Sequence, residues 1–426
     1  TPVTFDISVE EIFSPLLVGA RLVMARPEGH RDCRYLIDTI RAERVTRLAL
    51  VPSLMQALLE EPDLDACTSL RWVSAGGEAL RRTVLERFRA RLNVELVNLY
   101  GPTETTVEAA YWVVDQQVTT DVVPIGRPTA NAQLYVLDPH MQPVPIGVPG
   151  ELYIGGAGLA RGYLGRPELT AERFVPNPFS VEVGARLYKT GDLVRYLPDG
   201  NIEYLGRLDH QVKLRGFRIE LGEIEATLRE HPEVRDAAVV VREDPPGDKR
   251  LVAYVVSPAG TAPTREALRR FLREKLPEYM VPSAFVLLPA LPLTSSGKVD
   301  RRSLPSPASS RADTDYVAPR DAMELQLAQL WEDLLGVHPV GVTADFFELG
   351  GHSLLAGRVL ARVRERFHVE VSLRAFFGAP TVAGLATAIV QKLAERAEAG
   401  VLTGALEDLR GLSDEDARRR LGDQGA

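Results

Sequence analysis

Cysteine and histidine are both scarce in this sequence. The cysteines are Cys33 and Cys67, which lie too far apart along the chain to form a CxxC motif. We therefore expect no disulfide framework, and the cysteine content fits a reducing compartment such as the cytoplasm. The seven histidines are scattered, and none has a second ligand at the spacing of a metal site. The sequence therefore predicts no zinc centre.

Long apolar runs and an excess of positive charge are also absent. No stretch of about 18 apolar residues occurs, so we expect no transmembrane helix. The formal net charge is −8, which argues against general binding to nucleic acids or anionic membranes. The chain begins at Thr1 without a methionine and without a basic segment followed by an apolar one. This start predicts no signal peptide, and we expect a piece of a longer polypeptide.

The composition that remains is that of a soluble globular protein, with 45% hydrophobic and 25% charged residues. The length suggests roughly two to four domains. Apolar runs that alternate with helical patterns predict an α/β part, and frequent Gly and Pro between Pro124 and Tyr196 predict a β-rich part. The expected boundaries are 1–205 for this large subdomain, 206–302 for a small α+β subdomain, 303–320 for a linker, 321–396 for a helical bundle and 397–426 for a charged tail.

Apolar periodicity also predicts individual elements. The expected strands are 45–51, 70–74, 237–241, 251–256 and 284–288, and the expected helices are 53–60, 221–231 and 265–276. Three apolar stripes at helical spacing indicate the bundle, and they begin at Met323, Leu355 and Val382.

Ser353 follows Gly350-Gly351-His352, and the pattern predicts that it stands at or near the start of a helix. A phosphate is favoured there by the positive end of the helix dipole. The alternative is that Ser353 merely caps the helix. The stretch from Asp345 to Leu355 resembles the carrier-protein motif of nonribosomal peptide synthetases. The resemblance implies a four-helix carrier domain whose Ser353 bears covalent 4′-phosphopantetheine.

The sequence up to residue 302 resembles the amino-acid-adenylating family of the same synthetases, over almost its whole length. Six motifs carry this resemblance, and they occur in the family's order: Asn98–Thr106, Gly150–Leu164, Tyr188–Leu193, Gly206–Glu220, Leu276–Pro282 and Ser296–Arg301. The resemblance implies the adenylate-forming enzyme fold, which joins an amino acid to ATP and then loads it on the carrier. We expect ATP and Mg²⁺ as substrate and cofactor.

The family motifs imply roles for particular side chains. Adenylation brings a carboxylate to a phosphate, so catalysis needs cations and precise positioning. Lys298 would bridge the two anions, although a surface lysine is the simpler alternative; lysines are few here, six against 44 arginines. Asp209 resembles the hinge about which the small subdomain turns, which would withdraw Lys298 and bring in the Gly216 loop.

The remaining nucleotide contacts follow from the same resemblance. Asp192 would bind the ribose hydroxyls, with a turn-capping aspartate as the alternative. Glu104 would hold Mg²⁺, which needs one or two carboxylates besides phosphate oxygens. The other expected contacts are Tyr100 on the adenine face, Asn98, Gly76 and Gly77 at its edge, Thr103 at a phosphate and Arg207 at phosphate or ribose.

The segment beginning at Phe5 resembles the start of the family's amino acid pocket. Asp6 matches the carboxylate that pairs with the substrate ammonium, although it could also cap a helix. The other pocket positions fall on Ile7, Glu10, Ala49, Val73, Ala75, Leu99, Val107 and Glu108. Two carboxylates in one apolar pocket suggest a cationic side chain. We therefore predict ornithine, lysine, diaminobutyrate or arginine, unless one glutamate faces solvent.

One family motif is absent: the Gly- and Ser-rich phosphate loop would lie upstream of Phe5. We therefore expect the chain by itself not to adenylate. The alternatives are a carrier module with a vestigial adenylating part, or an acyl-CoA ligase fused to a carrier, which Asp6 disfavours. The expected partners are a phosphopantetheinyl transferase, neighbouring condensation or thioesterase domains and an MbtH-like helper protein.

Overall fold

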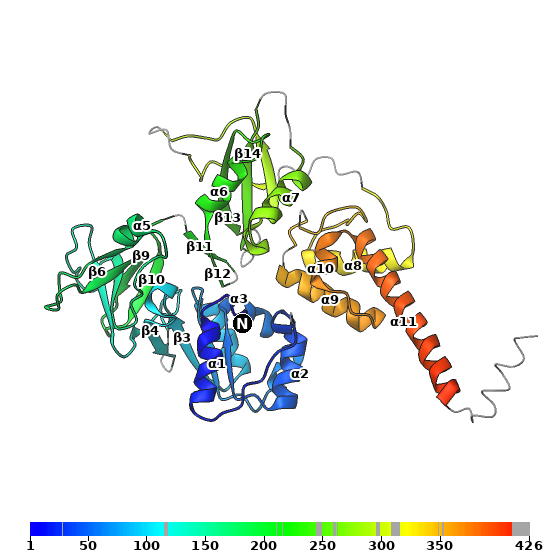
Figure 1. Cartoon of the computed structure of the whole chain (residues 1–426), viewed down its shortest axis with the longest axis horizontal. Coiled ribbons are helices and arrows are strands. Elements are labelled where there is room, and N and C mark those ends of the chain that lie inside the picture. Colours follow the sequence, from blue (N-terminus) through cyan, green and yellow to red (C-terminus); the bar gives the residue numbers. More distant parts are fainter. Residues whose placement is uncertain are drawn as a thin grey trace, which may run out of the picture. The chain divides into compact units, whose positions relative to one another are not determined.

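The structure is a computed structural model. It describes residues 1–27, 29–114, 118–209, 211–214, 216–243, 249–258, 261, 263–294, 299–307, 316–347, 349–351 and 353–410, without the side chains of residues 31, 353, 354, 373, 374 and 397–410. The chain forms two compact units, Thr1–Leu304 and Pro305–Ala426. In Figure 1 the first unit runs from blue to yellow-green and the helices of the second from yellow to red. Among the described residues, no helix is both long and apolar enough to span a bilayer.

The first unit opens with a five-stranded sheet in the order β1-β2-β3-β4-β5. The first three strands are parallel and the last two pairings are antiparallel. Their bounds are Arg47–Leu50, Trp72–Ala75, Glu95–Tyr100, Ala110–Val113 and Arg127–Pro128. The helices of this region are α1 (Ile7–Leu17), α2 (Cys33–Glu43), α3 (Pro52–Leu58) and α4 (Arg82–Arg91). The parallel strands end at one edge of the sheet, where Ala75 of β2 pairs with Asn98 of β3. The pairing brings a predicted pocket residue, Ala75, next to a predicted nucleotide contact, Asn98.

A second, antiparallel sheet has the order β10-β9-β7-β6, and β8 pairs with β9. Its strands are β6 (Ala132–Leu137), β7 (Gly150–Gly156), β8 (Phe174–Pro176), β9 (Arg186–Tyr196) and β10 (Ile202–Arg207), and α5 (Pro167–Arg173) precedes β8. Leu152, Val194 and Ile202 are fully buried in a core that also contains Tyr100 of β3. This shared core places β9 beside the end of β3.

The small subdomain begins with a hairpin of β11 (Gln211–Leu214) and β12 (Phe217–Glu220). A three-stranded sheet follows, in which β14 pairs antiparallel with β13 and parallel with β15. The elements are α6 (Leu221–Arg229), β13 (Asp236–Glu243), β14 (Lys249–Val256), α7 (Arg265–Lys275) and β15 (Ala284–Leu288). Ile224, Leu228, Leu268 and Leu272 pack the two helices on one face of this sheet.

The second unit is helical, with α8 (Ala322–Leu335), α9 (Ser353–Phe367), α10 (Leu373–Gly378) and α11 (Val382–Arg410). Trp331, Phe346 and Phe376 form an aromatic centre with ring centroids 4.9 to 5.9 Å apart. The side chain of Asp321 accepts a hydrogen bond from the Glu324 backbone at 2.8 Å and caps α8. The three predicted stripes lie on α8, α9 and α11, and α11 continues to Arg410, beyond the expected end of the bundle at 396.

Candidate nucleotide and amino acid site

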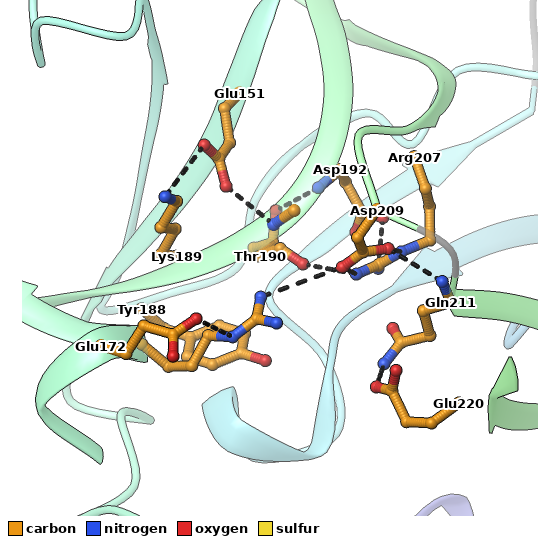
Figure 2. A network of polar contacts seen from close by, with 12 residues as sticks. Glu151, Glu172, Tyr188, Lys189, Thr190, Asp192, Arg207, Asp209, Gln211 and Glu220 are labelled. Carbon is orange, nitrogen blue, oxygen red and sulfur yellow. Dashed lines mark hydrogen bonds and ion pairs between the residues drawn. The ribbon is translucent and has the colours of Figure 1, made fainter. Parts of the chain in front are cut away.

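Asp192, the predicted ribose ligand, lies on β9 with its side chain almost fully buried. Its carboxylate accepts a hydrogen bond from the Tyr100 hydroxyl. It accepts a second, at 2.7 Å, from Nη1 of Arg207 (Figure 2). Its own amide donates to Oγ1 of Thr190 at 2.9 Å. The carboxylate is thus held by side chains rather than by a turn, which disfavours the capping alternative. Burial, and then the Asp192 charge, raise the pKa of Tyr100.

Arg207 connects Asp192 to Asp209, the predicted hinge residue (Figure 2). Its Nε and Nη2 donate to the two oxygens of Asp209, each at 2.7 Å. Burial alone would raise the pKa of Asp209, but the Arg207 hydrogen bonds and charge outweigh it and lower that pKa. Asp209 lies between β10 and β11, where the small subdomain begins. Arg207 was predicted to meet phosphate or ribose; here it is bound to these two aspartates.

The positions predicted to bind the base lie on β3 and directly after β2. The Asn98 side-chain amide donates to the carbonyls of Val123 and Pro124, at 3.2 and 2.8 Å. Its Oδ1 is buried and has no hydrogen-bond partner among the described residues. Gly76 and Gly77 directly follow β2, and Gly77 takes a left-handed φ of 81°. The unsatisfied acceptor fits an amino group such as that of adenine.

Glu104 lies in the short helix η3 (Thr103–Thr105), and both of its carboxylate oxygens are bound. Oε2 accepts from Nη1 of Arg218 at 2.6 Å, and Oε1 from the hydroxyl of Tyr163 at 2.6 Å. Burial would raise the pKa of Glu104, but the Arg218 charge and the Tyr163 hydrogen bond outweigh it and lower that pKa. The described residues contain no group of three or more His, Cys, Asp or Glu side chains that could hold a metal. Mg²⁺ at Glu104 would therefore need phosphate oxygens and water as its other ligands.

Asp6 stands at the start of α1, but its side chain makes no capping hydrogen bond there. Instead it accepts from Oγ1 of Thr103 at 2.5 Å, which joins the predicted ammonium ligand to the predicted phosphate contact. The capping alternative for Asp6 is therefore disfavoured.

Glu10 and Glu108 are brought together, from α1 and from the loop before β4. Burial, then the Glu10 charge and a carboxyl contact with Glu10, raise the pKa of Glu108 to about 8, against a smaller opposing effect of Arg47. Glu10 Oε2 and Glu108 Oε1 are buried without a hydrogen-bond donor in the described structure. Thr106 and Val107 have φ of 63° and 68°. Such backbone is costly for a β-branched residue and turns the chain just before Glu108.

The apolar pocket positions lie on the parallel strands and at their edges. Ala49 is on β1, Val73 and Ala75 on β2, and Leu99 on β3, and the last three are buried. Ile7 begins α1, and Val107 precedes Glu108. This arrangement gives a lining of small apolar side chains next to two carboxylates.

Two predicted residues are beyond what the structure describes. Lys298 lies outside the described residues, and the side chain of Ser353 is not described, although Ser353 is the first residue of α9. Gly350, with a φ of 99°, and Gly351 form the turn before this helix. A Cβ on Gly351 would lie 2.3 Å from the Phe346 ring, so the close packing of this turn requires glycine.

The structure also adds four residues whose roles sequence reasoning missed. Arg218 and Tyr163 bind Glu104, Lys213 Nζ lies 5.1 Å from the centre of the Tyr100 ring, and Glu78 binds the Gly216 amide at 2.8 Å. Burial lowers the pKa of Lys213. Three of the four lie inside the family motifs quoted above, and Glu78 directly follows Gly76-Gly77. Their positions in or beside these motifs were the only sequence signal that could have pointed to them.

Comparison with known families gives three matches in chain order. Residues 1–164 match the AMP-binding enzyme family, residues 223–298 the AMP-binding enzyme C-terminal domain, and residues 326–389 the phosphopantetheine attachment site. Asp6, Asn98 and Glu104 lie in the first matched segment and α9 in the third, whereas Asp192 and Arg207 lie between the first and second segments.

Curated relatives and solved structures agree with these matches. The chain is 52% identical over 387 residues to tyrocidine synthase 3 of Brevibacillus parabrevis, covering 91% of this chain and 6% of that protein. It is 48% identical over 428 residues to a phosphinothricin tripeptide synthetase of Streptomyces viridochromogenes, covering 98% and 36%. It thus spans well under half of either relative.

A solved structure with adenylation and peptidyl carrier domains, bound to a vinylsulfonamide inhibitor, matches with a TM-score of 0.71 and 32% identity. The match covers 91% of this chain and 64% of that one. The chain therefore belongs to the nonribosomal peptide synthetase family, and it carries an AMP-binding enzyme domain followed by a phosphopantetheine attachment domain.

Proposed function

We propose that this protein activates an amino acid as aminoacyl-AMP and then loads it as a thioester on its own carrier arm at Ser353. The family membership and the order of the three matched segments support this reading. Asp192 of β9 is hydrogen-bonded to Tyr100 at the end of β3. The unpaired Asn98 acceptor lies on the same strand, and Glu104 follows it in η3, so the three proposed nucleotide contacts are grouped around the end of β3.

The proposed reaction has two steps. A carboxylate oxygen of the amino acid attacks the α-phosphorus of ATP, and pyrophosphate leaves. In the second step AMP leaves the carbonyl carbon, and a pantetheine arm held on Ser353 would supply the thiol that replaces it as a thioester. Bound Mg²⁺ would neutralise charge on the phosphate oxygens. In the first step the chain contributes the positive charge of Lys298. Asn98 and Asp192 bind the adenosine, so the chain catalyses the reaction mainly by positioning its substrates and stabilising charge.

The substrate that we propose is a basic amino acid: ornithine, lysine, diaminobutyrate or arginine. The observation that carries this proposal is the contact between Glu10 and Glu108, whose buried oxygens lack donors. A cationic side chain would supply donors to both and remove the cost of crowding two carboxylates. Asp6, which caps no helix, remains available for the substrate ammonium.

Pyrophosphate exchange by the intact synthetase, measured with a panel of amino acids, tests this function. We expect the greatest exchange with a basic amino acid, and a loss of at least roughly tenfold in kcat/KM for that substrate in Glu108→Gln. The exposed Glu86, on α4, provides the matched control Glu86→Gln, which should leave exchange unchanged. Greatest exchange with a neutral aliphatic amino acid would contradict the substrate, and no exchange with any amino acid would contradict the adenylating function.

Loading requires a phosphopantetheinyl transferase as partner, because the arm is added after translation. Neighbouring condensation or thioesterase domains would consume the thioester, and an MbtH-like protein would assist folding or activity. We propose these partners from family membership.

A further inference from the structure

The first sheet has an open cavity of about 660 Å³ at the edge opposite the nucleotide site. Thr46 and Arg71, which line it, directly precede β1 and β2, whereas Gly76 and Gly77 directly follow β2. The rest of the lining comes from the end of α2 and from the loop that leads into β2. The four residues of β1, at about 3.3 Å each, separate the two edges by roughly 13 Å. The cavity is therefore separate from the nucleotide site.

The lining of this cavity has an excess of positive charge. It contains three arginines, Arg41, Arg44 and Arg71, and one acid, Asp38, in a chain whose formal net charge is −8. Within the described residues, the guanidinium groups of these three arginines form no hydrogen bond and no ion pair. Two positive charges are thus left in excess at one place on an acidic protein.

The carboxylates around the cavity are already paired with other arginines. Asp38 lies 3.7 Å from Nε of Arg34, which also pairs with Asp63. Asp65 lies 3.0 Å from Nη2 of Arg91. Asp63 and Asp65 belong to the short helix η2 (Pro62–Ala66), whose last residue lines the cavity. The acids of this region therefore do not neutralise the cavity.

Arginines near the end of a helix can also bind its free carbonyl groups, which would explain Arg41 and Arg44 without a ligand. Here other groups close the end of α2. The Arg44 and Val45 amides donate to the Ile40 carbonyl, and the Ser69 hydroxyl donates to the Val45 carbonyl at 2.8 Å. Arg44 has a φ of 53°, a left-handed conformation that favours glycine at this position. An arginine here costs stability, which fits a role in ligand binding.

We propose that this cavity binds a small polyphosphate anion, either an inorganic polyphosphate or the phosphate chain of a nucleotide. Guanidinium groups match phosphate oxygens with two parallel donors, and the exposed hydroxyls of Thr46 and Thr68 add further donors. In so open a cavity water and salt screen a single charge, so the ligand needs at least two. The volume is that of a small-molecule site. This inference does not rest on the proposed function.

Calorimetry of the intact synthetase, titrated with tripolyphosphate and separately with GTP, tests the proposal. We expect tripolyphosphate binding that weakens as salt is added, and an affinity that falls roughly tenfold in Arg71→Gln. The matched control is Arg87→Gln, which removes an exposed guanidinium of α4 and should retain the wild-type affinity. Binding of GTP but not of tripolyphosphate would assign the cavity to a nucleotide. Binding of neither by the wild type, or equal affinities in Arg71→Gln and wild type, would overturn the proposal.

Arg44→Gly separates ligand binding from folding. Glycine suits the left-handed position, so this variant should unfold at the wild-type temperature or above it, yet bind tripolyphosphate more weakly. Unchanged affinity in Arg44→Gly would also overturn the proposal. Pyrophosphate exchange reports on the other site: if the wild type shows none but binds tripolyphosphate through Arg71, the proposed function fails and this inference stands.

Discussion

Glu108 shows how two side chains of like charge define a pocket. Neither Glu10 nor Glu108 is unusual alone, and the sequence left open that one of them faces solvent. The fold places them in contact, and burial together with the Glu10 charge raises the pKa of Glu108 to about 8. With this pKa, Glu108 holds a proton near neutral pH.

This proton makes the stability of the protein depend on pH. The pKa of Glu108 rises on folding from 4.5 to about 8, so its stabilising contribution is complete below pH 4.5 and is lost as the pH rises through 8. In Glu108→Gln, the fall in the free energy of unfolding between pH 5 and 9 should be smaller than in wild type. Urea unfolding at several pH values measures it. Parallel pH profiles for the two proteins would refute the shared proton.

Other residues of the site could not be assigned from sequence. The motif containing Arg218 was evident, but a guanidinium can pair with any nearby acid, and its partner Glu104 lies 114 positions earlier. The hydrogen bond between Tyr163 and Glu104 could not be predicted for the same reason, because the two residues are 59 positions apart. Asp6, by contrast, had two readings in the sequence, and the missing cap bond disfavours the one in which it caps a helix.

At the scale of elements, periodicity located some helices and strands and left others unassigned. The elements it located are β1, β2, β13, β14 and β15, and α3, α6, α7, α8, α9 and α11. The strands of the small subdomain have continuous apolar runs, and β14 and β15 match their expected ranges closely. The helix α10 was missed, because six residues from Leu373 to Gly378 are too few to show a period. Its N-terminus does have a signal, since Ser372 accepts a hydrogen bond from the Ala375 amide at 3.2 Å.

The turn before α9 supports a prediction at this scale. In Gly351→Ala the new methyl would lie 2.3 Å from the Phe346 ring and 2.5 Å from its carbonyl oxygen. Because Phe346 belongs to the aromatic centre of the helical unit, we expect a loss of about 1–3 kcal/mol from overpacking. Calorimetric unfolding of the whole chain measures it. Gly378→Ala, with nothing within 4 Å of its Cβ, is the matched control and should lie within about 0.5 kcal/mol of wild type. Equal stability of the two variants would contradict this packing argument.

At the scale of the whole molecule, both AMP-binding enzyme segments lie in the first unit and the phosphopantetheine attachment segment lies in the second. The division follows the sequence, in which a Pro- and Ser-rich stretch separates α/β patterns from purely helical ones. What periodicity could not supply is how the two five-stranded sheets of the first unit pack against each other, because their common core joins residues as distant as Tyr100 and Ile202.

Carrier function gives the prediction at this scale. Incubation of the protein with coenzyme A and a phosphopantetheinyl transferase should add the mass of one arm, and Ser353→Ala should add none. Intact-mass spectrometry measures it, with Ser372→Ala as the control that retains the gain. An unmodified wild type, alongside a carrier protein that is modified in the same tube, would disprove the assignment of Ser353.

Arg207 has a consequence for how mutagenesis of this site should be interpreted. Its guanidinium serves Asp192 with one nitrogen and Asp209 with two others. When either acid is removed, the arginine still has a counterion, so single replacements will understate how firmly Asp192, the proposed ribose ligand, is tied to Asp209, the proposed hinge residue. A double-mutant cycle, in which both acids are replaced singly and together, measures that coupling.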